Sequence, residues 1–310
     1  MPVEFRVPLP GPLDVAGSLE LFRRSGDDLI DRWDGVRLVR CVPHGAGWAP
    51  FVARLTGAAA APAFDVVVDE PGHADAARQA VATTLVPAPA DYERLLAQDA
   101  VVARLDAQFP GIRQIRQLDL FTALVRCISA QQVNLRWAVT TRRRLAEAFG
   151  VRHEIRGETV YGLDPARIAD VDPAAIRAMQ FTTSKSISIV AVAQTLVRDG
   201  LTADSLAELP DEEVIARLVS IRGIGRWSAE WVLARTLGRG RVVAGDLGVR
   251  KAVGLAYLGT PLPSEQQVRD VTQHWGPSAS VAQAVLLQAL GEGALTVPPR
   301  QPVLRAASRA

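Results

Sequence analysis

Two different periods of apolar residues divide the chain. Up to about Leu85, apolar and polar side chains alternate in short runs, a pattern that predicts half-buried β-strands. Two stretches with helical spacing, near residues 13–24 and 74–85, interrupt these runs. The pattern predicts a small antiparallel sheet with helices on one side. The alternating runs are Val3, Phe5 and Val7; Val36 and Leu38; Phe51, Ala53 and Leu55; and Val66 and Val68.

From Asp91 onward the apolar period is helical. Apolar residues fall at i, i+3, i+4 and i+7 between Phe121 and Ile128, and the pattern recurs between Ile189 and Val197. The two prolines of the segment Val86–Ala90 cannot continue the preceding helix, so this segment is predicted to be a linker.

The length of 310 residues exceeds that of a typical single domain, which favours two compact units. The predicted fold is α+β. It comprises an α/β domain over residues 1–88, an all-α domain of two helical lobes over 89–290, and a flexible basic tail over 291–310.

Composition excludes several classes of protein. Two cysteines, Cys41 and Cys127, rule out a disulfide framework and an iron–sulfur cluster with four thiolate ligands from this chain. The amino terminus lacks the features of a secretion signal, and no run of 18 uncharged apolar residues occurs. We therefore expect a bacterial cytoplasmic protein, monomeric and with no membrane partner.

The small net charge of +2 conceals a local excess of basic residues. Lys185 and Lys251 are the only lysines, and the many arginines can reflect codon bias in a GC-rich genome alone. Between Arg217 and Lys251, however, eight basic residues face only two acids, Glu230 and Asp246. Such a segment favours a polyanionic partner.

The segment from Asp211 to Leu237 reads DEEVIARLVSIRGIGRWSAEWVLARTL and predicts two helices joined by a glycine hairpin. Gly223 and Gly225 permit a tight turn and expose backbone amides at the start of the second helix, where a phosphate can approach. Ile224 is predicted to anchor the hairpin in the core. The pattern indicates a helix-hairpin-helix that grips a DNA backbone through Arg222, Gly223, Ile224, Gly225 and Arg226; the alternative is an ordinary helical turn with a glycine cap.

Asp246 follows Gly225 by 21 residues and opens another helix within AGDLGVRK. Taken alone, this aspartate could be only an N-cap. After a glycine hairpin, the spacing resembles that of helix-hairpin-helix base-excision glycosylases, in which a catalytic aspartate follows the hairpin.

Within that superfamily the chain most resembles 3-methyladenine DNA glycosylase II, the AlkA type. The resemblance rests on IRGIGRWSAEW, AGDLGVRK, CISAQQVN at Cys127–Asn134 and FTTSKSISIVAVA at Phe181–Ala193. It implies that Asp246 stabilises the positive charge that develops on deoxyribose as the glycosidic bond breaks. Bifunctional members carry a nucleophilic lysine where this chain has Trp227, so the resemblance implies a glycosylase without lyase activity.

The resemblance also assigns the remaining site residues. It implies a base pocket formed by Trp227, Trp231, Leu247 and Leu287, although Trp227 could instead be a core residue. Gln132 takes the position of the wedge that fills the gap left by an everted base; alternatively, Gln131 and Gln132 are a solvated or capping pair. No cofactor is expected for catalysis. A Na⁺ or K⁺ ion held by the backbone carbonyls of Val219, Ile221 and Ile224 is implied at the hairpin.

The resulting hypothesis is a monofunctional N-glycosylase that everts and excises alkylated purines, such as 3-methyladenine and 7-methylguanine, from damaged double-stranded DNA during base excision repair. Aromatic faces attract such cationic bases. Two alternatives stay open: a glycosylase for a neutral lesion such as hypoxanthine or uracil, which needs more help for its leaving group, and a non-catalytic helix-hairpin-helix DNA-binding protein.

Overall fold

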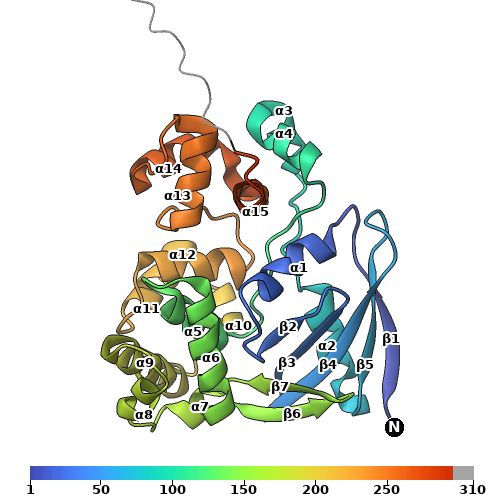
Figure 1. Cartoon of the computed structure of the whole chain (residues 1–310), viewed down its shortest axis with the longest axis vertical. Coiled ribbons are helices and arrows are strands. Elements are labelled where there is room, and N and C mark those ends of the chain that lie inside the picture. The colour runs from blue at the N-terminus through green and yellow to red at the C-terminus, as the bar shows by residue number, and fades with distance from the viewer. Residues whose placement is uncertain (296–310) are drawn as a thin grey trace, which may run out of the picture.

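The computed structural model describes residues 1–295 and shows a small sheet domain beside two helical lobes (Figure 1). The five-stranded antiparallel sheet has the order β1-β5-β4-β3-β2. Its strands are β1 Val3–Pro8, β2 Asp31–Trp33, β3 Arg37–His44, β4 Gly47–Thr56 and β5 Ala63–Val68. The alternating apolar runs predicted all of these strands except β2.

Two helices cover one face of the sheet. Helices α1 (Val15–Arg24) and α2 (Ala74–Ala82) share a hydrophobic core with inward side chains such as Phe51 and Phe64, both fully buried. The predicted sheet with helices on one side is confirmed. The short 3₁₀ turn Pro71–His73 precedes α2, and the predicted linker 86–90 contains no helix or strand.

The first helical lobe is built around one large core that runs from Leu120 to Leu233. Its helices are α5 Leu120–Ala130, α6 Leu135–Phe149, α7 Pro165–Ile168, α8 Pro173–Ala178, α9 Thr183–Asp199, α10 Ala203–Ala207, α11 Asp211–Val219 and α12 Arg226–Arg235. Polar caps fix several helix starts: the side chain of Asn134 accepts from the Trp137 amide, and that of Thr182 accepts from the Lys185 amide.

The prediction of an all-α second domain was wrong in one respect. Strands β6 (Val151–Ile155) and β7 (Glu158–Gly162) form an antiparallel hairpin between α6 and α7. Ile155 and Val160 pack against Val39 and Val52 on the sheet face opposite to the helices. The hairpin therefore covers the second face of the amino-terminal sheet. Its short, polar sequence gave no sign of this packing.

The second lobe joins two distant parts of the chain. Helices α3 (Tyr92–Gln98) and α4 (Ala100–Gln108) share a core with segments that follow residue 243. Those segments are α13 Leu247–Val253, the π-helical turn Gly254–Leu258, α14 Glu265–Thr272, the 3₁₀ segment Gln273–Ser278 and α15 Ala279–Gly291. Asp99 is central to this junction, because its carboxylate accepts from Tyr257, Trp275 and the ring of His274.

Buried ion pairs tie the sheet domain to the first lobe. Asp28 pairs with Arg126 of α5 and Arg142 of α6, each at 2.9 Å, and Asp31 pairs with Arg126 at 2.7 Å and with Arg40. Burial acts to raise the pKa of Asp28, but Arg126 and Arg142 outweigh it and hold that pKa at about 2.

No helix within residues 1–295 is long and apolar enough to cross a membrane. Most of the predicted tail 291–310 lies outside the described residues; Gly291 is the last residue of α15.

Candidate active site and nucleic-acid interface

Helices α11 and α12 form the predicted helix-hairpin-helix. Ile224 is 4% exposed and belongs to the core of the first lobe, as the motif predicts. Gly223 has a φ of +86°, and a β-carbon there would lie 2.0 Å from Ser188 Oγ on α9. This glycine is therefore required by backbone conformation and by the close approach of a neighbouring helix.

Gly225 meets a different requirement. A β-carbon at this position would have no atom within 4 Å, and Gly225 is the N-cap of α12 without any side-chain cap. The first amides of this ten-residue helix therefore lack a side-chain cap, and the space beside Gly225 is open, an arrangement that favours an anion. The predicted approach of a phosphate fits Gly225 better than Gly223.

Beside the hairpin lies the turn between α5 and α6. Gln132 is exposed and has a φ of +54°, a backbone conformation that non-glycine residues rarely adopt. The neighbouring Gln131 donates from Nε2 to the carbonyl oxygen of Gly223 at 3.2 Å. The two glutamines therefore do different things: Gln131 ties the turn to the hairpin, and Gln132 projects at its apex.

The segment that joins α12 to α13 runs from the first lobe to the second (Figure 1), and Asp246 is its last residue. It is the N-cap of α13, and its Oδ1 accepts from the Val249 amide at 3.0 Å. Among the described residues no hydrogen bond ends on Oδ2, and the residue is partly exposed. Capping fixes the carboxylate in place with one oxygen and leaves the other free.

Three of the predicted base-pocket residues lie close to Asp246 or to its neighbours in the chain. A β-carbon on Gly248 would lie 3.1 Å from both Asp246 Oδ1 and Leu287 Cδ2, so Leu287 borders the carboxylate. A β-carbon on Gly245 would lie 3.4 Å from Trp227 Cβ. Leu247, next in the chain, is 54% exposed. We call Asp246, Leu247, Trp227 and Leu287 the Asp246 site.

The two tryptophans of α12 differ in their surroundings. Trp231 packs against the core of the first lobe, whereas Trp227 is half-buried and stands outside the described core clusters. The alternative of Trp227 as a core residue is therefore not what the structure shows. One turn beyond Trp231, the guanidinium carbon of Arg235 lies 5.3 Å from the Trp231 ring centre.

The electrostatic surroundings of Arg235 include the carboxylate of Asp246. Burial lowers the pKa of Arg235, and the negative charge of Asp246 opposes that shift. Burial raises the pKa of the Cys127 thiol. The positive charge of Arg235 lowers this pKa, and the negative charge of Asp246 raises it. Cys127, Arg235 and Asp246 thus come from three separate segments into one electrostatic neighbourhood.

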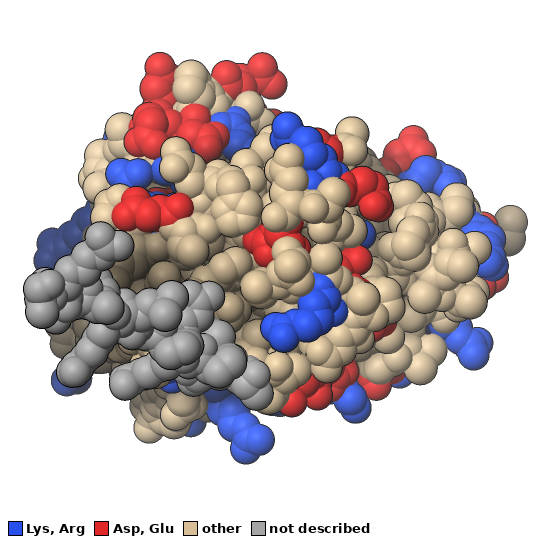
Figure 2. Space-filling view, turned by 90° about the horizontal axis from the view of Figure 1, so that it is seen from above, with Lys and Arg blue, Asp and Glu red and all other residues tan. Residues whose placement is uncertain are grey.

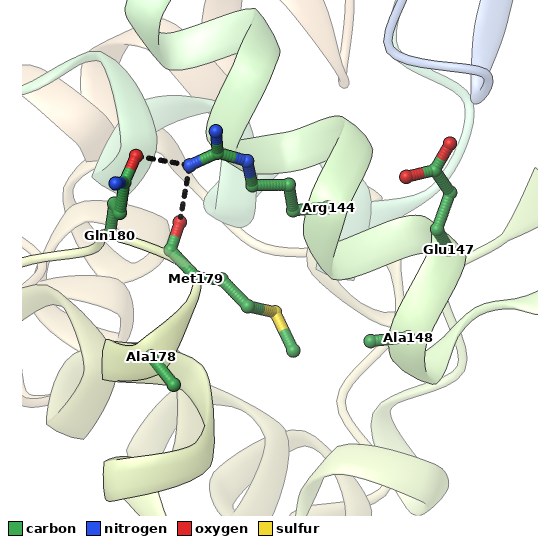
Figure 3. A pocket seen from close by; sticks show the side chains of 6 residues that line it. All are labelled: Arg144, Glu147, Ala148, Ala178, Met179 and Gln180. Atoms are coloured by element: carbon green, nitrogen blue, oxygen red, sulfur yellow. Dashed lines mark hydrogen bonds between the residues drawn. The ribbon is translucent and has the colours of Figure 1, made fainter.

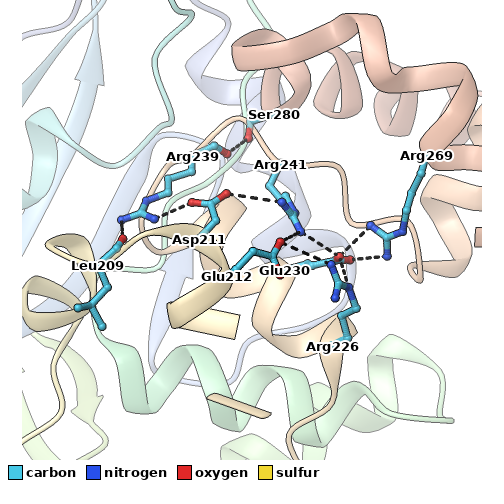
Figure 4. A network of polar contacts seen from close by, with 9 residues as sticks. All are labelled: Leu209, Asp211, Glu212, Arg226, Glu230, Arg239, Arg241, Arg269 and Ser280. Carbon is cyan, nitrogen blue, oxygen red and sulfur yellow. Dashed lines mark hydrogen bonds and ion pairs between the residues drawn. The ribbon is translucent and has the colours of Figure 1, made fainter. Parts of the chain in front are cut away.

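The arginines flanking the hairpin are partly neutralised. Glu230, fully buried on α12, accepts from Arg226 at 3.1 Å and from Arg269 at 2.8 Å, and lies 3.6 Å from Arg241 (Figure 4). Arg239 pairs with Asp211 at 2.6 Å. Arg222, by contrast, is exposed, and no ion pair engages it among the described residues. Of the two predicted DNA-contacting arginines, Arg222 is the more available.

Glu230 also connects the lobes. Arg226 belongs to α12, Arg241 to the connecting segment and Arg269 to α14 of the second lobe. One carboxylate therefore holds the hairpin helix against the lobe that carries Asp246 (Figure 4).

The surface at the upper end of Figure 1 carries interspersed acidic and basic side chains (Figure 2). A hollow of about 480 Å³ lies between α6 and α8, lined by residues such as Arg144 and Met179 (Figure 3). There Arg144 donates to Gln180 and to the Met179 carbonyl. The hollow lies on the first lobe and shares no lining residue with the Asp246 site.

The hairpin carbonyls were predicted to hold a monovalent cation. Among the described residues, no hydrogen bond ends on the carbonyl oxygens of Val219 or Ile224, whereas that of Ile221 accepts from the Ile224 amide. Two of the three oxygens are therefore free acceptors, which suits a cation that binds backbone oxygen.

Residues 125–278 match the family model of the HhH-GPD superfamily base excision DNA repair protein. This segment, about half of the chain, is therefore an HhH-GPD superfamily domain. The match includes the α5–α6 turn, the hairpin and Asp246.

Relatives of this HhH-GPD chain include two curated glycosylases. A DNA-3-methyladenine glycosylase of Bacillus subtilis is 28% identical over 59% of this chain and 61% of its own length. DNA-3-methyladenine glycosylase 2 of Escherichia coli is 27% identical over 44% of this chain and 48% of its own length. The matching segment thus spans only about half to three fifths of these relatives.

A solved structure shares the fold of nearly the whole HhH-GPD chain. The 3-methyladenine DNA-glycosylase from Archaeoglobus fulgidus superposes with a TM-score of 0.81 at 23% identity, covering 93% of this chain and 98% of that one. The match includes the amino-terminal sheet domain, so the predicted fold class is confirmed.

Sequence reasoning missed three residues of this HhH-GPD site. Arg235 stands four residues after Trp231, as Trp231 does after Trp227, so helical spacing was a signal that could have found it. Glu230 and Gln131 gave no such signal. Their partners, Arg269 and the Gly223 carbonyl, are distant in sequence and become neighbours only in the fold.

Proposed function

We propose that this chain is a monofunctional DNA N-glycosylase that excises alkylated purines, of the 3-methyladenine and 7-methylguanine type, from duplex DNA and leaves an abasic site. The observation that carries the proposal is the free Oδ2 of Asp246, which the cap to Val249 holds on the segment between the lobes, with Leu287 near the carboxylate and Trp227 against the adjacent Gly245. Membership of a base excision repair superfamily supports it.

Each part of the interface has a role in this reaction. The uncapped amides of α12 bind a backbone phosphate, Gln132 fills the space left by the everted nucleotide, and the tryptophans contact the base. When the C1′–N bond of a cationic purine breaks, the purine leaves as a neutral molecule. The Asp246 carboxylate stabilises the positive charge on the sugar and orients the water that attacks C1′.

A cation at the hairpin would be held by the free carbonyl oxygens of Val219 and Ile224, with Ile221 alongside. Such an ion supplies positive charge for a DNA phosphate.

The residue at position 227 and the burial of Lys185 support the proposed lack of lyase chemistry. Lyase activity by Schiff base needs an amine at C1′, and Trp227 occupies the position that a lysine takes in bifunctional relatives. Lys185 is 9% exposed and its Nζ donates to the Ser129 carbonyl at 2.9 Å. Lys251 is exposed on α13, five residues after Asp246.

The alternative of a non-catalytic DNA-binding protein predicts that Asp246 is only a cap. The cap exists, but it uses one oxygen of the two. The test is to incubate the protein with methylated duplex DNA and treat the product with hot alkali. Strand breaks only after alkali, with no covalent adduct in borohydride, are expected. Tight binding without abasic sites would contradict the proposal.

A further inference from the structure

Arg235 extends the line of aromatic side chains on α12. Trp227, Trp231 and Arg235 follow one another at intervals of four residues and so share one face of the helix. The guanidinium lies over the Trp231 ring at 5.3 Å, a cation–π contact that fixes its position. The side chain is partly exposed, so solutes can reach it.

Apart from Trp231, the part of the chain that the structure describes offers this guanidinium no partner. Within residues 1–295, no hydrogen bond or ion pair engages its nitrogen atoms, although most other arginines at the lobe junction are paired. A guanidinium carries five N–H donors, and it has lost part of its hydration here, since burial lowers its pKa. A bound molecule with acceptor atoms would satisfy those donors.

The position of Arg235 distinguishes between two kinds of acceptor. It is the last residue of α12, about 13 Å along the helix axis from Arg226 at the hairpin. The phosphate bound at the hairpin amides is therefore too far away to be its partner. The guanidinium lies over the Trp231 ring, on the helix face that also carries Trp227. A β-carbon on Gly245, next to Asp246, would lie 3.4 Å from Trp227 Cβ. Arg235 therefore belongs to the side of α12 on which the everted base would be placed.

We propose that Arg235 determines lesion specificity: it donates hydrogen bonds to the departing purine and thereby makes neutral purines substrates. The proposal rests on the proposed glycosylase function and deepens it. A positively charged guanidinium repels a cationic purine and attracts one that becomes an anion.

The chemistry of the two lesion classes differs in the leaving group. When the C1′–N9 bond of a neutral purine breaks, both electrons go to the base, which departs as an anion hydrogen-bonded to Arg235. Water forms the new bond to C1′ and releases its proton to the Asp246 carboxylate or to solvent. The purine anion then takes up a proton from solvent, and Arg235 stays protonated throughout. A cationic alkylated purine departs as a neutral molecule and does not need this help.

The test compares two duplexes of the same sequence, one with hypoxanthine and one with 7-methylguanine, under single-turnover conditions. Arg235→Met removes the charge and keeps a flexible side chain against Trp231. It is expected to lower hypoxanthine excision about tenfold or more, because a hydrogen bond to a charged group is lost, and to leave 7-methylguanine excision unchanged or faster. Arg235→Lys keeps the charge and is expected to retain part of the hypoxanthine activity.

Arg198→Met is the matched control, since Arg198 is exposed on α9 and pairs only with Asp199 among the described residues. Equal losses on both lesions in Arg235→Met would overturn the proposal, because Arg235 would then bind the nucleotide phosphate or support the fold. A wild-type protein that excises 7-methylguanine but not hypoxanthine would overturn it while the proposed function stands. Excision of neither lesion by the wild type would overturn the function itself.

Discussion

The side-chain amide of Gln131 donates a hydrogen bond to the carbonyl oxygen of Gly223 at 3.2 Å. This contact joins the turn between α5 and α6 to the glycine hairpin between α11 and α12. The proposed wedge at Gln132 would thereby be held at a fixed position relative to a phosphate at the hairpin.

Gln132→Ala should slow excision without abolishing DNA binding. Eversion of a paired nucleotide costs a few kcal/mol, and a shorter side chain fills less of the gap that it leaves. We expect single-turnover excision from a fully paired duplex to fall about tenfold, and to fall less when the lesion is unpaired. Gln180→Ala is a suitable control, because Gln180 is also exposed with a positive φ of 73°. Similar losses in both substrates would argue against a wedge.

Alanine substitutions of the two hairpin glycines should affect different properties, stability for Gly223 and DNA affinity for Gly225. Gly223→Ala forces a side chain into a left-handed conformation and against Ser188, so it should destabilise the protein by about 2 kcal/mol or more. Gly225→Ala has open space around it and should leave the melting temperature nearly unchanged while weakening DNA binding. Thermal melts and duplex titrations distinguish these outcomes. Normal affinity in folded Gly225→Ala would place the phosphate elsewhere.

Local sequence determined much of this structure, and long-range contacts determined the rest. The alternating runs from Val3 to Val68 and the IRGIG motif report on neighbours in the chain, and the strands and the helical hairpin that they predict are present. The β6–β7 hairpin was missed because its partners, Val39 and Val52, lie far away in sequence. The basic excess near the hairpin was overestimated for a similar reason: Asp211 and Glu212 precede the counted segment but fold against Arg239 and Arg241.

The exposed Arg222 should contribute to the salt dependence of DNA binding. A basic residue that neutralises one phosphate releases one condensed counterion, so Arg222→Ala should reduce the slope of log affinity against log salt by about 1. Arg198→Ala should leave the slope unchanged, since Arg198 lies on α9 and pairs with Asp199. Duplex titrations between low and moderate salt measure both values. An unchanged slope in Arg222→Ala would remove Arg222 from the interface.

Because Asp28 pairs with arginines of the first lobe, the free energy of unfolding should fall at acid pH. The folded pKa of Asp28, about 2, lies below the ordinary value of 3.8, so this residue stabilises the fold fully above about pH 4 and loses this effect as the pH falls toward 2. The shift corresponds to about 2 kcal/mol. Asp28→Asn leaves Arg126 and Arg142 without this partner and should cost about 3 to 5 kcal/mol at pH 7.

Urea denaturation of the wild type and Asp28→Asn at pH 7 and pH 3 measures this effect. The stability difference between the two proteins should shrink at the lower pH. A difference that is the same at both values would show that the pairing of Asp28 does not control acid sensitivity.

The most direct test of the whole account is single-turnover excision by Asp246→Asn on methylated duplex DNA, measured beside its duplex affinity. Asparagine keeps the N-cap to Val249 but removes the negative charge. We predict that affinity stays within about twofold of the wild type while excision falls at least about a hundredfold. Excision at the wild-type rate would show that the Asp246 carboxylate does not stabilise the transition state, and the account of this site would be wrong.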